Sequence, residues 1–324
     1  MIAAPPAPPS DTTARAVAFV AAHRDAAEAL GTSLAELSND PDGFATALTH
    51  GLARLSDPEY VAGQQRVAPG IGPIHGVRWP LIAAVARGFR NATRHDRATP
   101  FLFIADRLFG ERELEARWFA FGLLERTLAA ETERTWQLLR RAAREARDWI
   151  TVDSLAHPYG VGIAAEPYRW AELEQLVYSP SRWERRLVGS TIATMTHVDR
   201  RRGRNPEVAG HALPLLAQLM GDAEPDVEKA LSWAYRSLTT VDRAATEAAL
   251  RAETEQAART ADGHRAWVIR DTLSKLDPAT ADDLRSRLVG IRKRAGAPAT
   301  SAAAEAAARF GALPDPAQHP EPPL

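Results

Sequence analysis

The chain has 324 residues, enough for one large or two ordinary domains with a sizeable core, and its formal net charge is −1. That charge counts against a simple nucleic-acid-binding domain, which is usually strongly basic. The sequence has no cysteine, which excludes disulfide bonds, thiolate metal sites and cysteine nucleophiles. No apolar run approaches the ~20 residues that cross a bilayer, and the N-terminus lacks signal-peptide features, so we expect a soluble cytoplasmic protein.

Both ends of the chain differ in composition from the rest. Residues 1–13 are rich in proline and alanine and are predicted to be a disordered tail. Residues 14–295 are predicted to form a single helical-repeat domain. Residues 296–324 combine an alanine-rich patch with a proline-rich end and are predicted to be largely flexible, with a short helix possible around Ala302 to Phe310.

Between the tails, helix-like segments follow one another, and long valine/isoleucine alternation typical of strands is missing. The first is "TARAVAFVAAHRDAAEAL". "RWPLIAAVARGFRN" follows the turn-rich stretch "APGIGPIHG", and "RELEARWFAFGLLERTL" follows "FGE". "ETERTWQLLRRAAREARDW" then leads into the next segment, "ARDWITVDSLAH". We predict loops at "HPYGVG" and "YSPS", because proline and glycine punctuate regular structure.

A loose repeat runs through the second half of the chain. "WERRLVGSTIATM" starts at Trp183, "VEKALSWAYRSL" at Val227 and "RAWVIRDTLSKL" at Arg265, so the starts lie 44 and 38 residues apart. Paired-helix repeats of the HEAT and armadillo kind have periods of ~40–47 residues. The spacing predicts an all-α superhelical solenoid of stacked helix pairs with a concave binding surface.

Four residues in these segments could form one site. Trp149 and Asp153 lie four residues apart, which puts them on the same face of a helix. Arg186 lies in the first repeat segment and Trp233 in the second. Two indoles, a carboxylate and a guanidinium from successive repeats would suit a cationic, ring-bearing substrate.

Each of these residues also has a structural interpretation. Trp149 could be a helix-packing tryptophan, and Asp153 could be a helix N-cap, where aspartate is favoured. Arg186 and its neighbour Arg185 could be a solvated pair, and Trp233 could join the apolar stripe of its helix. Only the joint occurrence of the four residues favours a site.

Three short motifs connect these residues to a known family. They are the W-x-x-x-D of "WITVD", the W-x-R-R of "WERR" and the K-A-x-x-W of "KALSW", with Arg186 33 residues after Asp153 and Trp233 47 residues after Arg186. In order and spacing the chain resembles the AlkD-like DNA glycosylases, helical-repeat enzymes that remove alkylated purines. The resemblance runs from "GIGPIHGVRWPLI" to "IRKR". The interval before Trp233 is longer here and holds the polar insertion "DRRRGRNPE".

The resemblance implies a role for each residue. Cleavage of the glycosidic bond of a cationic 3- or 7-alkylpurine develops positive charge on the deoxyribose, and Asp153 would stabilise that charge and position a water. Trp149 and Trp233 would flank the sugar. Arg186 would hold the DNA backbone through a phosphate contact. The residues assigned to DNA binding are Arg186, Arg185 and Lys229.

The resemblance also implies that the lesion in duplex DNA is held without an enclosing base pocket, so bulky adducts should be tolerated. We expect a monomeric base excision repair enzyme that needs neither metal nor organic cofactor. His157 and His197 stand alone, and His211 and His264 show no metal-ligand spacing to partners. No candidate lysine for a Schiff base lies near Asp153, so no lyase activity is expected. A general repair role and self-resistance to a DNA-alkylating natural product fit equally well.

The alternative is a catalytically silent helical-repeat module that binds DNA or a protein through its concave face. The neutral net charge favours this alternative, whereas the presence of Asp153 with both tryptophans favours the enzyme. Basic runs do not decide the question, because such runs are usually solvated faces and loops. The runs comprise Arg182, Arg185, Arg186, Arg200, Arg201, Arg202 and Arg204, and then Arg292, Lys293 and Arg294.

Overall fold

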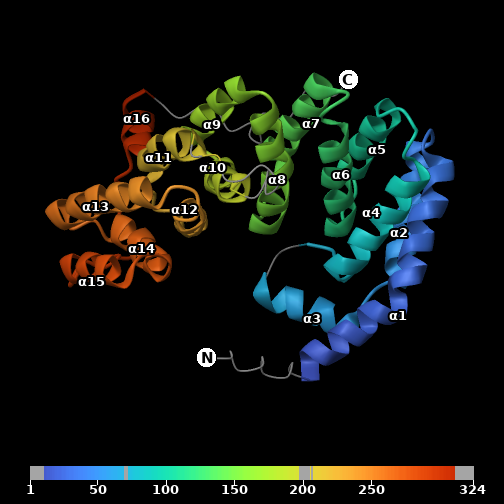
Figure 1. Ribbon diagram of the computed structural model, residues 1–324, viewed down its shortest axis with the longest axis horizontal. Helices are drawn as coiled ribbons and strands as arrows, with labels where there is room; N and C mark the ends of the chain where they lie inside the picture. Colours follow the sequence, from blue (N-terminus) through green and yellow to red (C-terminus); the bar gives the residue numbers. More distant parts are fainter. Residues whose placement is uncertain (1–10, 69–71, 197–204, 206, 311–324) are drawn as a thin grey trace. The chain divides into compact units, whose positions relative to one another are not determined.

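The computed structural model describes residues 11–68, 72–196, 205 and 207–310. These residues form sixteen α-helices and three short 3-10 helices, without a strand among them (Figure 1). The all-α prediction is therefore confirmed. Residues 1–10 and 311–324, which are most of the first predicted tail and about half of the second, lie outside the described residues. So does most of the polar insertion, including its four arginines.

By their internal contacts the residues group into two compact units, Met1–Thr135 and Trp136–Leu324. The boundary falls within helix α7 (Thr132–Glu145). The single domain expected over residues 14–295 stays a prediction. None of the described helices is both long and apolar enough to cross a membrane.

The first unit is built on a cluster of phenylalanines. Phe44, Phe89, Phe101 and Phe119 form successive ring contacts with centroid separations of 5.3 to 6.0 Å, and helix α1 packs along α4. The helices are α1 (Asp11–Leu34), α2 (Pro41–Arg54), α3 (Pro58–Val67), α4 (Trp79–Ala92), α5 (Thr99–Phe109) and α6 (Leu114–Thr127).

A buried carboxylate holds the stretch before α4. Residues 72–78 have no helix, as predicted for this turn-rich stretch. Glu115 of α6, only 1% exposed, accepts hydrogen bonds from the backbone N–H groups of His75, Gly76 and Val77 at 3.0, 2.7 and 3.1 Å. The carboxylate thus replaces the backbone partners that a helix would have supplied.

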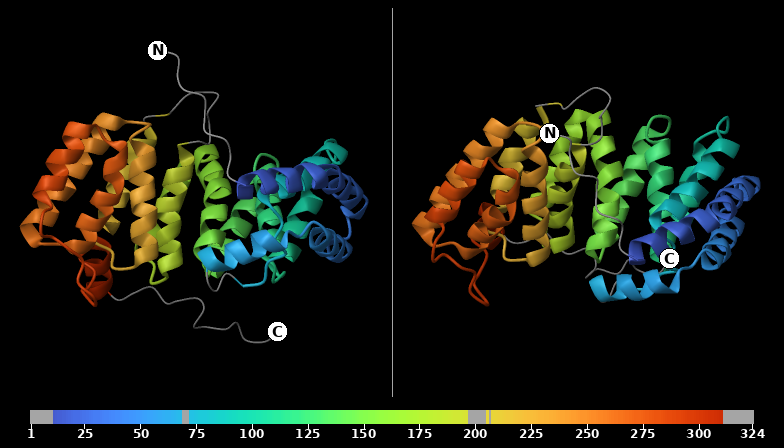
Figure 2. Two further views of the ribbon diagram at one scale, coloured as in Figure 1. Left: turned by 90° about the horizontal axis from the view of Figure 1, so that it is seen from below. Right: turned by 60° about the horizontal axis from the view of Figure 1, so that its bottom comes forward.

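The second unit is a stack of helix pairs. Helices α8, α10, α12 and α14 pack in series, and α9, α11, α13 and α15 form a second series beside them (Figures 1 and 2). The three predicted repeat segments correspond to α10, α12 and α14. The helices are α8 (Trp149–Ala165), α9 (Trp170–Val177), α10 (Arg182–Met195), α11 (Glu207–Leu219), α12 (Pro225–Leu238), α13 (Arg243–Thr260), α14 (Gly263–Thr272), α15 (Pro278–Arg287) and α16 (Ala302–Phe310).

One loop prediction is wrong. The stretch "HPYGVG", residues 157–162, lies inside α8, and the helix continues through Pro158. A proline within a helix removes one backbone hydrogen bond. Here Tyr159 is 1% exposed and packs on Trp136 with ring centroids 4.5 Å apart, so tertiary packing overrides the local preference. The loop predicted at "YSPS" does separate α9 from α10.

The short helix considered near the C-terminus is present as α16, which contacts α11. Residues before it are bonded to the unit: the Thr300 N–H donates to the Gly221 carbonyl at 2.8 Å, and its hydroxyl donates to Asp262. The Ser301 hydroxyl accepts from the Ala304 N–H at 3.2 Å. Residues 300–304 are therefore tied to the repeat stack.

Candidate active site

Helix α8 carries two of the proposed catalytic residues, Trp149 and Asp153. Asp148 is the N-cap, accepting hydrogen bonds from the Thr151 N–H and hydroxyl at 2.7 Å each. The helix starts at Trp149, so Asp153 lies in its second turn and shares a face with Trp149. The interpretation of Asp153 as an N-cap is wrong, because Asp148 caps this helix.

Three donors on helix α10 hold the Asp153 carboxylate. The Arg186 guanidinium donates from Nε to Oδ1 at 3.0 Å and from Nη2 to Oδ2 at 2.7 Å. The Ser190 hydroxyl donates to Oδ1 at 2.6 Å. A carboxylate has roughly four acceptor positions, so one remains for a water or a ligand. The side chain of Asp153 is 21% exposed, which leaves the fixed carboxylate open to solvent.

Arg186 also connects α10 to α12. Its third nitrogen, Nη1, donates to the backbone carbonyl of Asp226 in the first turn of α12 at 2.6 Å. Its side chain is only 6% exposed. The interpretation of Arg186 as part of a solvated pair is therefore wrong: its guanidinium orients a carboxylate. A phosphate contact from Arg186 stays a prediction.

The two tryptophans are half-buried and come from different helices. The guanidinium carbon of Arg186 lies 5.8 Å from the ring centroid of Trp149, within the range of a cation–π contact. Trp233 lies on α12, which packs against α10. Neither indole is fully enclosed in the core. The four predicted residues therefore lie on three helices of one unit, packed in the order α8, α10, α12.

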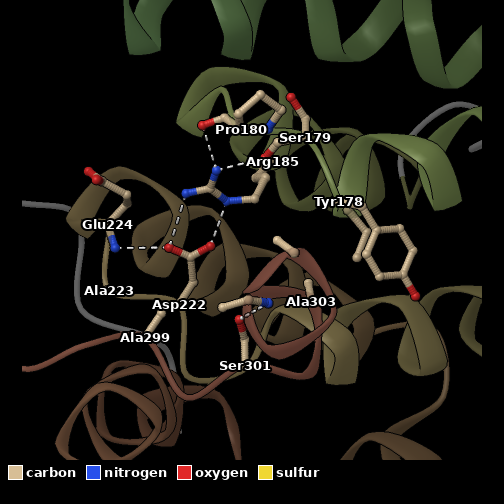
Figure 3. A pocket seen from close by; sticks show the side chains of 13 residues that line it. Tyr178, Ser179, Pro180, Arg185, Asp222, Ala223, Glu224, Ala299, Ser301 and Ala303 are labelled. Carbon is tan, nitrogen blue, oxygen red and sulfur yellow. Dashed lines mark hydrogen bonds and ion pairs between the residues drawn. The ribbon is translucent and has the colours of Figure 1, made fainter. Parts of the chain in front are cut away.

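The remaining predicted DNA contacts differ from each other. Arg185 turns away from Asp153 and pairs with Asp222 at 2.7 Å, while Nη1 donates to the carbonyls of Ser179 and Pro180 at 2.8 and 3.0 Å (Figure 3). Lys229, one helical turn before Trp233, is exposed on α12. DNA binding by Arg185 and by Lys229 stays a prediction, and Lys229 has the more accessible side chain.

A close approach of two backbones brings α10 and α12 together. A Cβ atom added at Gly189 would lie 2.8 Å from the carbonyl carbon of Ala230 and 2.9 Å from its Cβ. Real Cβ contacts are not that short, so only glycine permits this spacing. The approach lies between Arg186 and Ser190 in sequence, at the turn that holds Asp153.

Sequence reasoning missed Ser190, Asp226 and Gly189. Ser190 follows Arg186 by four residues, so helical spacing could have placed both on one face. Asp226 acts through its backbone carbonyl and Gly189 through the side chain it lacks. For these two residues the sequence carries no signal of the role.

These observations define an all-helical repeat protein with an arginine-clamped aspartate on α8 and half-buried tryptophans on α8 and α12. The sequence profile of the DNA alkylation repair enzyme family matches residues 48–264, and the chain belongs to this family. A solved structure, a predicted DNA alkylation repair enzyme from Enterococcus faecalis, is 13% identical over 72% of this chain and 97% of that chain, with a TM-score of 0.48. No curated protein matches the sequence.

Proposed function

We propose that the protein is a monofunctional DNA glycosylase that hydrolyses the N-glycosidic bond of cationic 3- or 7-alkylpurines in duplex DNA. Membership of the DNA alkylation repair family supports the substrate class. The observation that carries the proposal is the Asp153 carboxylate, held by Arg186 and Ser190 yet partly open to solvent. A carboxylate fixed in this way is prepared to stabilise a developing cation without reorganising.

The reaction breaks the bond between the purine nitrogen and the anomeric carbon. Alkylation makes the purine cationic, so it leaves with the electron pair of that bond, and positive charge passes to the deoxyribose. Asp153 stabilises this charge and accepts a hydrogen bond from the water that attacks the anomeric carbon. The proton that the water loses passes to solvent. Trp149 and Trp233 present indole faces that stabilise the same cation.

The arrangement also suggests how the substrate is held. Arg186, Arg185 and Lys229 are the proposed contacts to the DNA backbone, with the protein acting as a monomer. Asp153 and the tryptophans act on the sugar, so the modified base need not enter a pocket, in contrast to base-flipping enzymes that enclose it. The mechanism uses neither a metal ion nor a Schiff base.

Asp153→Asn tests the proposal. We expect the wild type to release free 7-methylguanine and 3-methyladenine from methylated duplex DNA, and the variant to lose at least about 100-fold in rate, because a neutral amide stabilises the sugar cation poorly. Duplex binding, measured by fluorescence anisotropy at low salt, should survive. The single-turnover rate constant of base release is the quantity to compare.

Asp57→Asn is the matched control, since it breaks another buried Arg–Asp pair, that of Arg78 in the first unit, and neither residue is assigned to catalysis or DNA binding. It should cost stability but leave base release near the wild-type rate. Equal base release by wild type and Asp153→Asn would refute the catalytic assignment. DNA binding without release of any methylated base, or of a bulky 7-alkylguanine offered in the same assay, would favour the silent binding module.

A further inference from the structure

A second carboxylate clamp joins helices α12 and α14. The Ser232 hydroxyl of α12 donates to Oδ2 of Asp271 on α14 at 2.6 Å. Arg236, one turn further along α12, pairs with the same carboxylate and also donates to the backbone carbonyl of Asp271 at 3.0 Å. One aspartate thus holds two residues of one α12 face.

This clamp repeats the chemistry of the first. Asp271 follows Trp267 by four residues, as Asp153 follows Trp149. In both cases a serine and an arginine four residues apart on a neighbouring helix hold the carboxylate. The order of the helices along the chain is reversed. Asp153 lies on a helix that precedes the helix of its donors, whereas Asp271 lies on a helix that follows the helix of its donors.

The surroundings of the two carboxylates differ. The side chain of Asp271 is 43% exposed, against 21% for Asp153. The indole of Trp267 already has a cation over its face, because the Lys293 ammonium lies 5.3 Å from the ring centroid and is held there by Glu228 at 2.5 Å. A substrate cation would have to displace this tethered lysine. A copy of the catalytic site is therefore a poor explanation of the second clamp.

The residue next to the clamp gives a better explanation. Ser232 directly precedes Trp233, and the same helix is held at its first turn by Arg186 through the Asp226 carbonyl. Helix α12 is therefore tied to α10 at its start and to α14 at the turn that carries Trp233. Rotation of α12 about its axis would change the position of the Trp233 indole relative to α10, which holds Asp153, and these two attachments oppose such a rotation.

We propose that Asp271 is a positioning residue that fixes Trp233 relative to Asp153 by holding Ser232 and Arg236. This inference rests on the proposed function and assigns a residue outside the W-x-x-x-D, W-x-R-R and K-A-x-x-W motifs. Partial burial alone would raise the pKa of Asp271, but the Ser232 hydroxyl and the Arg236 guanidinium outweigh it and hold the pKa below its usual range. The clamp is accordingly charged at neutral pH.

A double-mutant cycle tests the proposal, with base release from 7-methylguanine duplex DNA measured in single turnover. Asp271→Ala should lower the rate constant about 10-fold in a chain that has Trp233, because small misplacements of a reacting group are costly. In a Trp233→Ala chain it should lower the rate less than about 2-fold, since the residue it positions is gone. Asp271→Asn keeps an acceptor for Ser232, so its rate constant should fall less than that of Asp271→Ala.

Asp283→Ala is the control, because Asp283 of α15 also pairs with exposed arginines, Arg251 and Arg287. It should leave the rate unchanged in both backgrounds. Equal losses from Asp271→Ala with and without Trp233, or no loss in either, would overturn the proposal.

A second readout does not depend on activity. With 5-fluorotryptophan incorporated, the resonance of Trp233, assigned with Trp233→Phe, should shift in Asp271→Ala and not in Asp283→Ala. An unmoved resonance would refute the positioning role even if the wild type released no base. If the wild type released no base but the Trp233 resonance shifted in Asp271→Ala, only the proposed function would be refuted.

Discussion

Arg186 shows how one side chain can serve a site by holding another residue in place. Its guanidinium orients Asp153 with two nitrogens and reaches α12 with the third. Breaking a buried ion pair on one side is costly because it leaves a desolvated charge without a partner. The pairing thus makes the position of the carboxylate depend on both neighbouring helices.

Substitutions of Arg186 should separate the effect of its charge on base release from the effect of its two-pronged contact with Asp153. Arg186→Lys keeps the charge but loses the two-pronged contact, so we expect base release to fall about 10-fold. Arg186→Ala should cost about 100-fold in rate and about 3 kcal/mol in the free energy of unfolding. Single-turnover assays and urea unfolding measure the two effects.

Arg182→Ala provides the comparison on the same helix. The Arg182 side chain is 48% exposed and pairs loosely with Glu224 at 3.5 Å, so its loss should change the unfolding free energy by less than about 0.5 kcal/mol. Wild-type activity in Arg186→Lys would show that the two-pronged geometry is not needed.

At the scale of the helix, the site depends on how closely α10 approaches α12. Arg186 can reach the Asp226 carbonyl because Gly189 allows its backbone to lie against Ala230. The same contact sets the distance between the helix that clamps Asp153 and the helix that carries Trp233. Helix packing and site geometry are therefore coupled at one residue.

Gly189→Ala should separate these helices. A methyl group there would lie within 3 Å of the backbone of Ala230, so we expect a loss of about 1–3 kcal/mol in unfolding free energy and reduced base release. Gly210→Ala on α11 is the control, because its added methyl group would meet no atom within 4 Å. It should be neutral or stabilising by up to about 1 kcal/mol. Similar effects of both substitutions would contradict the close-packing argument.

At the scale of the molecule, buried and half-buried carboxylates make stability depend on pH. Burial alone would raise the pKa values of Asp57 and Asp262. At Asp57 the effect of burial is outweighed by the Arg78 guanidinium, so its pKa lies below its usual range. At Asp262 it is outweighed by Thr300 and Arg265, with the same result. The pKa of Asp271 is lowered as well.

Glu253 has the opposite shift, because burial raises its pKa. Lowered carboxyl pKa values give stability that is complete above the unfolded pKa and is lost as the pH falls through the folded values. The raised pKa of Glu253 makes stability increase as the pH falls. The three aspartates outnumber this one group, so we expect a net loss of stability in acid.

The urea midpoint should therefore be steady from about pH 7 to about pH 5 and fall between about pH 4 and pH 2. Arg78→Met removes the cation that lowers the Asp57 pKa, so its stability at pH 7 should be lower and its fall on acidification smaller. An equal fall in wild type and variant would show that the Asp57–Arg78 pair does not contribute to the acid response.

The sequence by itself determined the helical class, the repeat segments and the four residues of the candidate site. These features depend on helical spacing and on ordered motifs, both of which are local or nearly local. Trp149 and Asp153 could be placed on one face because four residues make about one helical turn.

Only the tertiary structure decided what these residues do to one another. The pairing of Arg186 with Asp153, the separate pairing of Arg185 with Asp222 and the helix that continues through Pro158 all depend on contacts between distant segments. Local sequence does not encode which of two adjacent arginines faces a neighbouring helix. Packing between whole helices makes that choice, because it determines which side chains are buried together and which donors a carboxylate can reach.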